Sequence, residues 1–264
     1  MNNFDFHRPA SVADALKALD AASDGKLLAG GQSLLPTMRQ RLAAPSDIVD
    51  LGAIAELKGI KLEADGITIG ATTTHAEVAA SADVKKTIPA LAVLAGGIGD
   101  RQVRHRGTIG GSLANNDPAA DYPAAALGLG ATIRTNKREI KADDYFKGLF
   151  ETALAEGEII TAVHFPKPEK AGYVKFNQPA SRFCLVGVFV AKTKAGVRVA
   201  VTGAGPGVFR SKELETALGA NFTADAAKGV KVKADGMNSD LHGSPEYRAS
   251  LTSTLAARAV AAAG

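Results

Sequence analysis

Cysteine and tryptophan are almost missing from this chain of 264 residues, which has one cysteine, Cys184, and no tryptophan. A single thiol forms no internal disulfide, and it cannot by itself hold an iron–sulfur cluster or a structural zinc ion. Aromatic residues make up only 5% of the sequence, which argues against a platform that stacks nucleic-acid bases. Cys184 opens the apolar stretch CLVGVFVA, where we expect a buried and inert thiol.

Long apolar runs and clustered charges are missing as well. No apolar stretch approaches the length of a membrane span, and the start MNNFDFHRPA has no charged segment followed by an apolar one. We therefore expect no secretory signal and a cytoplasmic protein. The net charge is +4 with scattered Lys and Arg, so no nucleic-acid partner is indicated. A hydrophobic fraction of 46% is typical of a globular protein with a sizeable core.

The first part of the chain alternates predicted helices and strands. Ser11 caps a predicted helix that carries apolar residues at helical spacing, and residues 26–29 predict a short strand. A second helix is expected over 33–42, and a second strand over 48–51. These short connections between alternating elements predict a small α/β lobe.

The middle of the chain opens with a hairpin. Apolar and polar residues alternate on both sides of the turn Asp65-Gly66. Thr74 and Glu77 then form a capping box for another helix. After a helix over 88–94, residues 96–123 show little periodicity, and so long a loop in a compact domain is usually functional. A helix and a strand follow from 122, and another strand covers 158–166.

Prolines and charges without periodicity at 167–170 predict a domain boundary. Beyond it we expect strands near 173–177, 184–191 and 197–203, and then a helix from Ser211. A last helix begins at Pro245 after a Ser cap. Strands followed by helices predict an α+β domain.

Two loops combine glycine with a nearby serine, one at 30–33 (GGQS) and one at 108–112 (TIGGS). Glycine permits a close backbone approach, and free N–H groups at a helix start hold anions, so two such loops could bind the two halves of a pyrophosphate. The alternative is two ordinary turns, which for a lone glycine pair is the commoner case. Neither loop fits a P-loop or a Rossmann fingerprint.

Other polar residues allow two interpretations. Asp121 is placed either to accept hydrogen bonds from sugar hydroxyls or to cap the helix that starts at Tyr122. The five histidines are dispersed without metal-ligand spacing, and His164 lies in an apolar strand, so structural roles are favoured. No nucleophile–base pair and no metal site stand out.

Taken together, AGGQSLLPTMRQRL with IVDL (29–51) and QVRHRGTIGGSLANNDPAADYPAAAL (102–127) resemble the two flavin-binding signatures of one family. This family is the FAD-binding (medium) subunit of molybdenum hydroxylases of the carbon monoxide dehydrogenase and xanthine dehydrogenase type. The resemblance extends to FDFHRPAS, EIITAVHFP and SPEYRASLTSTLAARAV, and so covers the chain in order.

The resemblance implies an α+β protein with a vanillyl-alcohol-oxidase (PCMH)-type FAD-binding fold. Two α/β subdomains, 1–57 and 58–168, would grip FAD, and a C-terminal α+β domain of the CO dehydrogenase flavoprotein type, 169–264, would cover the far side. The implied cofactor-binding residues are Lys26, Leu28, Ala29, Gly30, Gly31, Gln32, Ser33, Leu34, Ile98, Gly99, Thr108, Gly111, Ser112, Ala114, Asn115, Ala120, Asp121, Ile160, Lys175 and Phe183.

Within this set the resemblance implies distinct roles. Residues 29–34 would cradle the pyrophosphate, and Thr108, Gly111, Ser112 and Asn115 would reach the phosphates and the ribityl chain. Ile98 and Gly99 would line the cofactor, Asp121 would bond to it, and Ile160 and Lys175 would lie near the isoalloxazine ring.

Three positions depart from the family pattern. Gln32 stands where some relatives have His, and Phe183 where the carbon monoxide dehydrogenase type carries a Tyr. The segment 175–183 (KFNQPASRF) lacks the basic cluster that many relatives carry after this lysine, and retains only Lys175 and Arg182. Since nearby charge tunes a flavin, the environment of the ring is expected to differ.

The single cysteine agrees with the division of labour that the resemblance implies. An iron–sulfur small subunit and a molybdopterin large subunit would complete a heterotrimer that itself dimerises. Electrons would pass from molybdenum through two [2Fe–2S] clusters to FAD on this chain and on to an external acceptor. No catalytic residue is assigned here, because the flavin does the chemistry. A flavin-free scaffold of the same assembly and a stand-alone flavin oxidoreductase are the alternatives.

Overall fold

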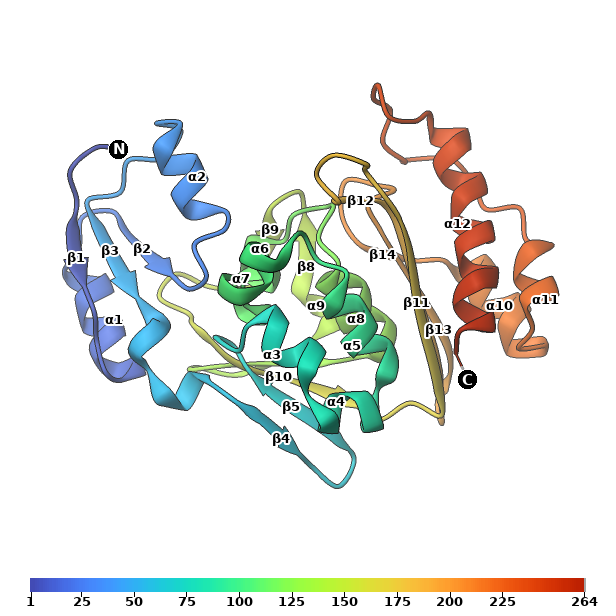
Figure 1. The fold of residues 1–264 in the computed structure, drawn as a ribbon, viewed down its shortest axis with the longest axis horizontal. Coiled ribbons are helices and arrows are strands. Elements are labelled where there is room, and N and C mark those ends of the chain that lie inside the picture. The colour runs from blue at the N-terminus through green and yellow to red at the C-terminus, as the bar shows by residue number, and fades with distance from the viewer. Residues whose placement is uncertain (264) are drawn as a thin grey trace.

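The computed structural model describes residues 1–263, and its first part is a small parallel sheet with two helices (Figure 1). The strand order is β1-β3-β2. Ser11 caps the first helix by accepting a hydrogen bond from the N–H of Asp14, as predicted. The elements are β1 (Asp5–His7), α1 (Val12–Ala21), β2 (Gly25–Leu28), α2 (Leu34–Arg39), β3 (Asp47–Asp50), η1 (Leu51–Ala53) and η2 (Ala55–Leu57).

A second, five-stranded antiparallel sheet has the order β4-β5-β10-β6-β7. The predicted hairpin, β4 and β5, forms one edge of this sheet. The strand β10, which comes last of the five in the sequence, lies in the centre. Ile67, Val163 and Phe165 point into the core, whereas Thr68 and His164 pair on the opposite, polar face. The strands are β4 (Ile60–Leu62), β5 (Gly66–Gly70), β6 (Thr132–Thr135), β7 (Glu139–Lys141) and β10 (Ile160–Pro166).

A layer of helices covers the apolar face of this sheet. Thr74 and Glu77 form the predicted capping box at its start. The expectation of an irregular loop over 96–123 is wrong, because two short helices, α6 and α7, lie there with Asp100 and Thr108 as caps. The helices are α3 (His75–Ala80), α4 (Ala82–Thr87), α5 (Pro89–Gly96), α6 (Arg101–Arg106), α7 (Ile109–Asn115), α8 (Tyr122–Leu129) and α9 (Ala142–Tyr145).

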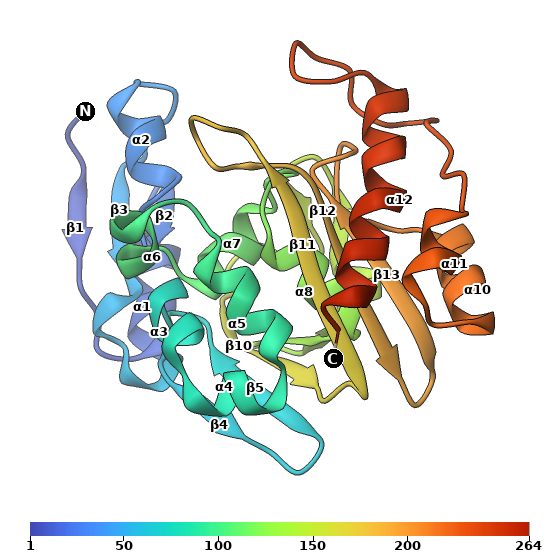
Figure 2. The same ribbon diagram turned by 45° about the vertical axis from the view of Figure 1, so that its right-hand side comes forward.

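The last part of the chain adds a four-stranded antiparallel sheet in the order β11-β12-β13-β14, with helices on its outer side (Figures 1 and 2). The helix α8 packs on the inner face of this sheet, and the long helix α12 on the outer face. The elements are β11 (Lys170–Asn177), β12 (Cys184–Thr193), β13 (Gly196–Thr202), β14 (Phe209–Arg210), α10 (Lys212–Ala220), α11 (Ala224–Lys228) and α12 (Pro245–Ala261); a small hairpin, β8 (Phe146–Gly148) and β9 (Glu151–Thr152), precedes them.

Each large sheet draws its strands from one stretch of the chain, 5–50, 60–166 and 170–210. The strands and helices expected beyond 170 are present, including α12 with its Ser244 cap. The resulting architecture is the mixed α+β fold that the sequence predicts. Among residues 1–263 no helix is long and apolar enough to cross a membrane.

Candidate functional site

A cleft of about 730 Å³ lies where the three-stranded sheet meets the helices α6 and α7 and the β11–β12 loop. Its volume is within the range of small-molecule and cofactor sites. All the residues that the resemblance implied, except Lys175, line this one cleft. Segments far apart in sequence, around residues 30, 100, 110, 120, 160 and 182, therefore meet around one ligand-sized space.

The first glycine loop connects β2 to α2, and some of its backbone N–H groups are free to bind a ligand. Gly31 has φ +70°, a left-handed conformation that favours glycine. The backbone N–H groups of Gly31, Gln32 and Ser33 donate no hydrogen bond to another residue among 1–263. Successive free N–H groups around a left-handed residue form a concave anion-binding nest. This loop is therefore both a turn and a suitable phosphate cradle.

Gly30 marks the point where this loop touches the backbone that connects α6 to α7. A Cβ on Gly30 would lie 2.2 Å from the carbonyl oxygen of Arg106 and 2.6 Å from the Cα of Gly107. No side chain fits there, so glycine is required for the two backbones to close one wall of the cleft.

The second glycine loop differs from the prediction, which gave it free N–H groups as well. Gly110 and Gly111 lie inside the first turn of α7, and their N–H groups donate to the carbonyl of Ala71 (2.8 Å) and the hydroxyl of Thr108 (3.2 Å). The N–H of Ser112 donates to the carbonyl of Thr108 at 3.0 Å. These donors are already used, so this loop offers a ligand its side chains and its close backbone approach.

Asp121 is buried on the wall of the cleft, and its side chain makes no helix-capping hydrogen bond. Its Oδ1 accepts a hydrogen bond from the Tyr173 hydroxyl at 2.6 Å and lies 2.9 Å from the Lys175 ammonium. Burial raises the pKa of Asp121, an effect that Lys175 and Tyr173 oppose. Asp121 thus occupies the N-cap position of α8 without capping it through its side chain, and residues of strand β11 hold the carboxylate.

Lys175 lies behind Asp121 instead of on the cleft wall. Its ammonium also donates to the carbonyl oxygen of Arg182 at 3.2 Å, which ties Asp121 to the β11–β12 loop. That loop is closed by a hydrogen bond from the N–H of Gln178 to the carbonyl of Phe183 (2.8 Å). Phe183 is 54% exposed on the rim of the cleft.

Sequence reasoning missed three residues of this site. His75 lines the cleft, although the sequence favoured a structural role for it as for the other histidines. Glu158 lines the cleft with a carboxylate held by Arg138, Thr135 and the N–H of Ala155. Tyr173 supports Asp121 from β11. Its place two residues before Lys175, on the same strand face, was the one available signal.

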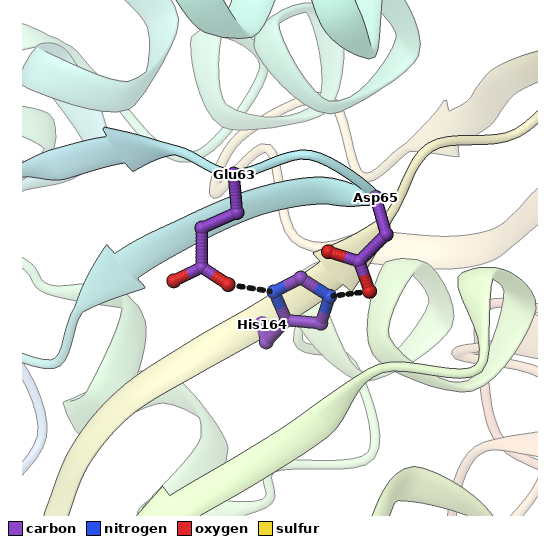
Figure 3. A group of neighbouring side chains, drawn as sticks. All are labelled: Glu63, Asp65 and His164. Carbon is purple, nitrogen blue, oxygen red and sulfur yellow. Dashed lines mark ion pairs between the residues drawn. The ribbon is translucent and has the colours of Figure 1, made fainter.

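Cys184 is buried, as expected, and burial holds the pKa of its thiol well above the usual value. On the polar face of the five-stranded sheet, His164 lies between Glu63 (3.4 Å) and Asp65 (3.5 Å), as Figure 3 shows. Sequence spacing missed this cluster because a hairpin and a distant strand assemble it. Arg134 pairs with Glu63 at 3.3 Å, so the cluster forms an ion-pair network that ties the β4–β5 turn to β10.

Comparison with known proteins decides the family. Residues 2–168 match the family described as the FAD binding domain in molybdopterin dehydrogenase. The chain belongs to the FAD-binding subunits of the molybdenum hydroxylases.

Relatives of this FAD-binding subunit match it nearly end to end. The nicotine 6-hydroxylase medium subunit of Paenarthrobacter nicotinovorans is 38% identical over 97% of this chain and 95% of its own length. The carbon monoxide dehydrogenase medium chain of Hydrogenophaga pseudoflava is 34% identical over 98% and 96%. A solved structure of carbon monoxide dehydrogenase from the same organism superposes with a TM-score of 0.87 at 34% identity, covering 99% of this chain and 97% of that one.

The residues of the cleft fit FAD. An anionic pyrophosphate matches the three free N–H groups of the first loop, and glycines keep the walls open where a Cβ would collide. The FAD-binding subunit is thus part of an oxidoreductase, since its relatives are named as subunits of dehydrogenases and a hydroxylase.

Proposed function

We propose that this FAD-binding subunit carries electrons from [2Fe–2S] clusters on a partner subunit through FAD to an external acceptor. The observation that supports it best is the first glycine loop, where three consecutive residues whose N–H groups have no partner within residues 1–263 line a cofactor-sized cleft. When bound, FAD supplies the electron-transfer chemistry. The protein's residues bind and orient it.

Each wall of the cleft has its own task in this proposal. The N–H groups of residues 31–33 bind the anionic oxygens of the pyrophosphate. Ser112 and Asn115 reach the phosphates and the ribityl chain from α7 through their side chains, because the backbone donors there are already used. Asp121, fixed by Tyr173, presents a carboxylate whose direction does not change when the ligand enters.

In this proposal the positive charge nearest the flavin ring, that of Lys175, is largely neutralised by an ion pair. Lys175, which the resemblance places near the ring, does not line the cleft, and its ammonium is paired with Asp121 at 2.9 Å. With the usual basic cluster missing from 175–183, the field at the ring comes mainly from this neutral pair. Phe183, exposed on the rim of the cleft, would shield a bound flavin from water.

The rest of the electron route requires other chains. One cysteine cannot hold an iron–sulfur cluster, so we propose an iron–sulfur small subunit and a molybdopterin large subunit as partners in a heterotrimer that dimerises in the cytoplasm. Relatives carry names such as medium subunit and medium chain, which supports a multi-subunit enzyme.

The cradle is tested by Gly31→Ala. The alanine would have to adopt a strained left-handed backbone conformation, and its Cβ would lie 2.8 Å from Leu35 Cδ1. FAD affinity, measured by titration of the apoprotein, is therefore expected to fall about tenfold or more. Gly236→Ala is the matched control, because Gly236 has φ +75°, open space around it and no place on the cleft. It should retain wild-type affinity. Equal affinity in both variants would contradict the cradle.

The alternatives are separated by purification. A wild-type chain that binds no FAD when isolated or in its native complex is a scaffold. A chain that oxidises an organic substrate alone is a stand-alone oxidoreductase. Our proposal expects flavin on this chain, recovery of a large and a small cysteine-rich partner, and no organic substrate turnover without them.

A further inference from the structure

His75 is a buried histidine on the wall of the FAD cleft. It is 5% exposed and begins α3, and its backbone N–H donates to the carbonyl of Gly107 at 3.0 Å. This places the imidazole directly under the segment that leads into the second glycine loop. Both His75 and Gly107 line the cleft.

Two polar atoms beneath this wall have no partner. Within the described part of the chain, neither Nδ1 of His75 nor the hydroxyl of Tyr122 makes a hydrogen bond, although both are buried. The two rings lie 5.3 Å apart between centroids, tilted by 46°. Buried polar atoms without partners are rare and costly, and here a donor and an acceptor stand next to each other. A hydrogen bond between the two would satisfy both atoms.

The protonation states of the two groups limit how this pair can hydrogen-bond. Burial, together with the charge of Arg104, lowers the pKa of His75 to about 4, so the imidazole is neutral at pH 7. Burial also raises the pKa of Tyr122, which keeps its proton. A hydroxyl that keeps its proton can donate to Nδ1 of a neutral imidazole, an arrangement that would leave the imidazole proton on Nε2.

Nε2 lies against the wall at a position where the sequence has glycine. A Cβ on Gly107 would be 2.5 Å from Nε2 of His75, although Gly107 itself has no left-handed backbone that calls for glycine. Because Gly107 has no side chain, the Nε2 edge of the imidazole can lie against this wall without a clash. Nε2 makes no hydrogen bond within residues 1–263 and is not among the fully buried unpartnered atoms, so it is the ring nitrogen that retains exposed surface in this cleft-lining residue.

We propose that His75 is a further cofactor-binding residue, a neutral imidazole whose Nε2–H donates to an anionic oxygen of bound FAD, with Tyr122 as the positioning residue that fixes this tautomer. The proposal rests on the FAD-binding function proposed above. A neutral donor serves here because it binds an anion without an ionisation change near pH 7.

The first test compares FAD dissociation constants of the apoprotein and its variants. His75→Phe retains the ring shape without the donor and should weaken binding about tenfold, whereas His75→Gln retains an N–H donor and should stay within about threefold of wild type. Tyr122→Phe should weaken binding on its own but add little in the His75→Phe background. A folded His75→Phe variant with wild-type affinity overturns the proposal.

The second test needs no cofactor. ¹⁵N NMR of the apoprotein should show His75 in the Nε2–H tautomer near pH 7 and a mixture of tautomers in Tyr122→Phe. A charged imidazole, or the Nδ1–H tautomer, overturns the proposal even where a variant fails to fold. These outcomes leave the FAD-binding function standing, whereas a wild-type chain that never binds FAD rejects both.

Discussion

At the scale of single residues, the buried imidazole of His75 makes the stability of the folded protein sensitive to acid. Its pKa is about 4 in the folded chain and about 6.5 when unfolded, so the unfolded state binds the extra proton as pH falls below 6.5. Stability must then decrease with falling pH, by roughly 2 kcal/mol between pH 6.5 and 5. Urea unfolding at both pH values should show this decrease in wild type and its absence in His75→Phe. An unchanged slope in the variant would show that another group is responsible.

Glu158 gives the same sign of pH dependence at lower pH, although here the fold stabilises the charged form of the side chain instead of the neutral one. Hydrogen bonds from Arg138 above all, with Ala155 and Thr135, lower the pKa of this carboxyl to about 2. The stabilisation is complete above about pH 4.5, the pKa of the unfolded state, and is lost as pH falls towards 2. Glu158→Gln should therefore reduce the free energy of unfolding by roughly 2 kcal/mol at pH 7. The gap to wild type, followed by urea unfolding, should shrink steadily below pH 4; a constant gap contradicts the assignment.

The role of a residue could be predicted from the sequence only where it belongs to a recognisable motif of neighbouring residues. The glycines and polar residues of the two loops could be assigned from local motifs and from the family resemblance. His75, Tyr122 and Glu158 could not, because their roles arise from burial and from partners across the fold. The free N–H groups of the first loop and the used ones of the second also depend on geometry that two similar motifs do not reveal.

At the scale of elements, local capping signals predicted helices well. Ser11, Thr74 and Ser244 each cap the helix that the sequence expects. The helices α6 (RQVRHR) and α7 (IGGSLAN) were missed because α6 has a single apolar residue and α7 contains two glycines, so neither shows the apolar spacing of a helix. Docking on the rest of the fold stabilises them.

That docking makes a counter-intuitive prediction for Gly110 in α7. Alanine favours helices over glycine by about 1 kcal/mol, yet a Cβ on Gly110 would lie 2.6 Å from the Cβ of Ala71 and 2.7 Å from its carbonyl oxygen. We expect Gly110→Ala to destabilise the protein by roughly 1–3 kcal/mol in urea unfolding. Gly219→Ala in α10 is the control, with nothing within 4 Å, and should be neutral or stabilising. A stabilised Gly110→Ala variant would show that propensity outweighs packing here.

At the scale of the whole molecule, local sequence patterns could not predict the order of the strands in the sheets or the shape of the cleft. β10 enters between β5 and β6 only after about 90 residues of intervening chain, and β3 separates β1 from β2. Such pairings depend on which long-range contacts bury the most apolar surface, a quantity that periodicity does not contain. The family resemblance supplied the fold because it covers the chain in order.

The same long-range packing predicts that residues 1–168 do not fold alone, although they hold the whole family match. Every residue of α8 is buried, and α8 packs against β12 and β13 of the last sheet. Arg198 of β13 also donates to the carbonyl of Leu127 at 3.0 Å. Truncation after 168 exposes this apolar helix, so the fragment should be mostly insoluble, or soluble with a dye-binding apolar surface and no near-ultraviolet circular dichroism. Co-expression of residues 169–264 as a separate chain should restore solubility. A truncated chain with a cooperative unfolding transition would instead show that the C-terminal domain only covers a core that is already complete.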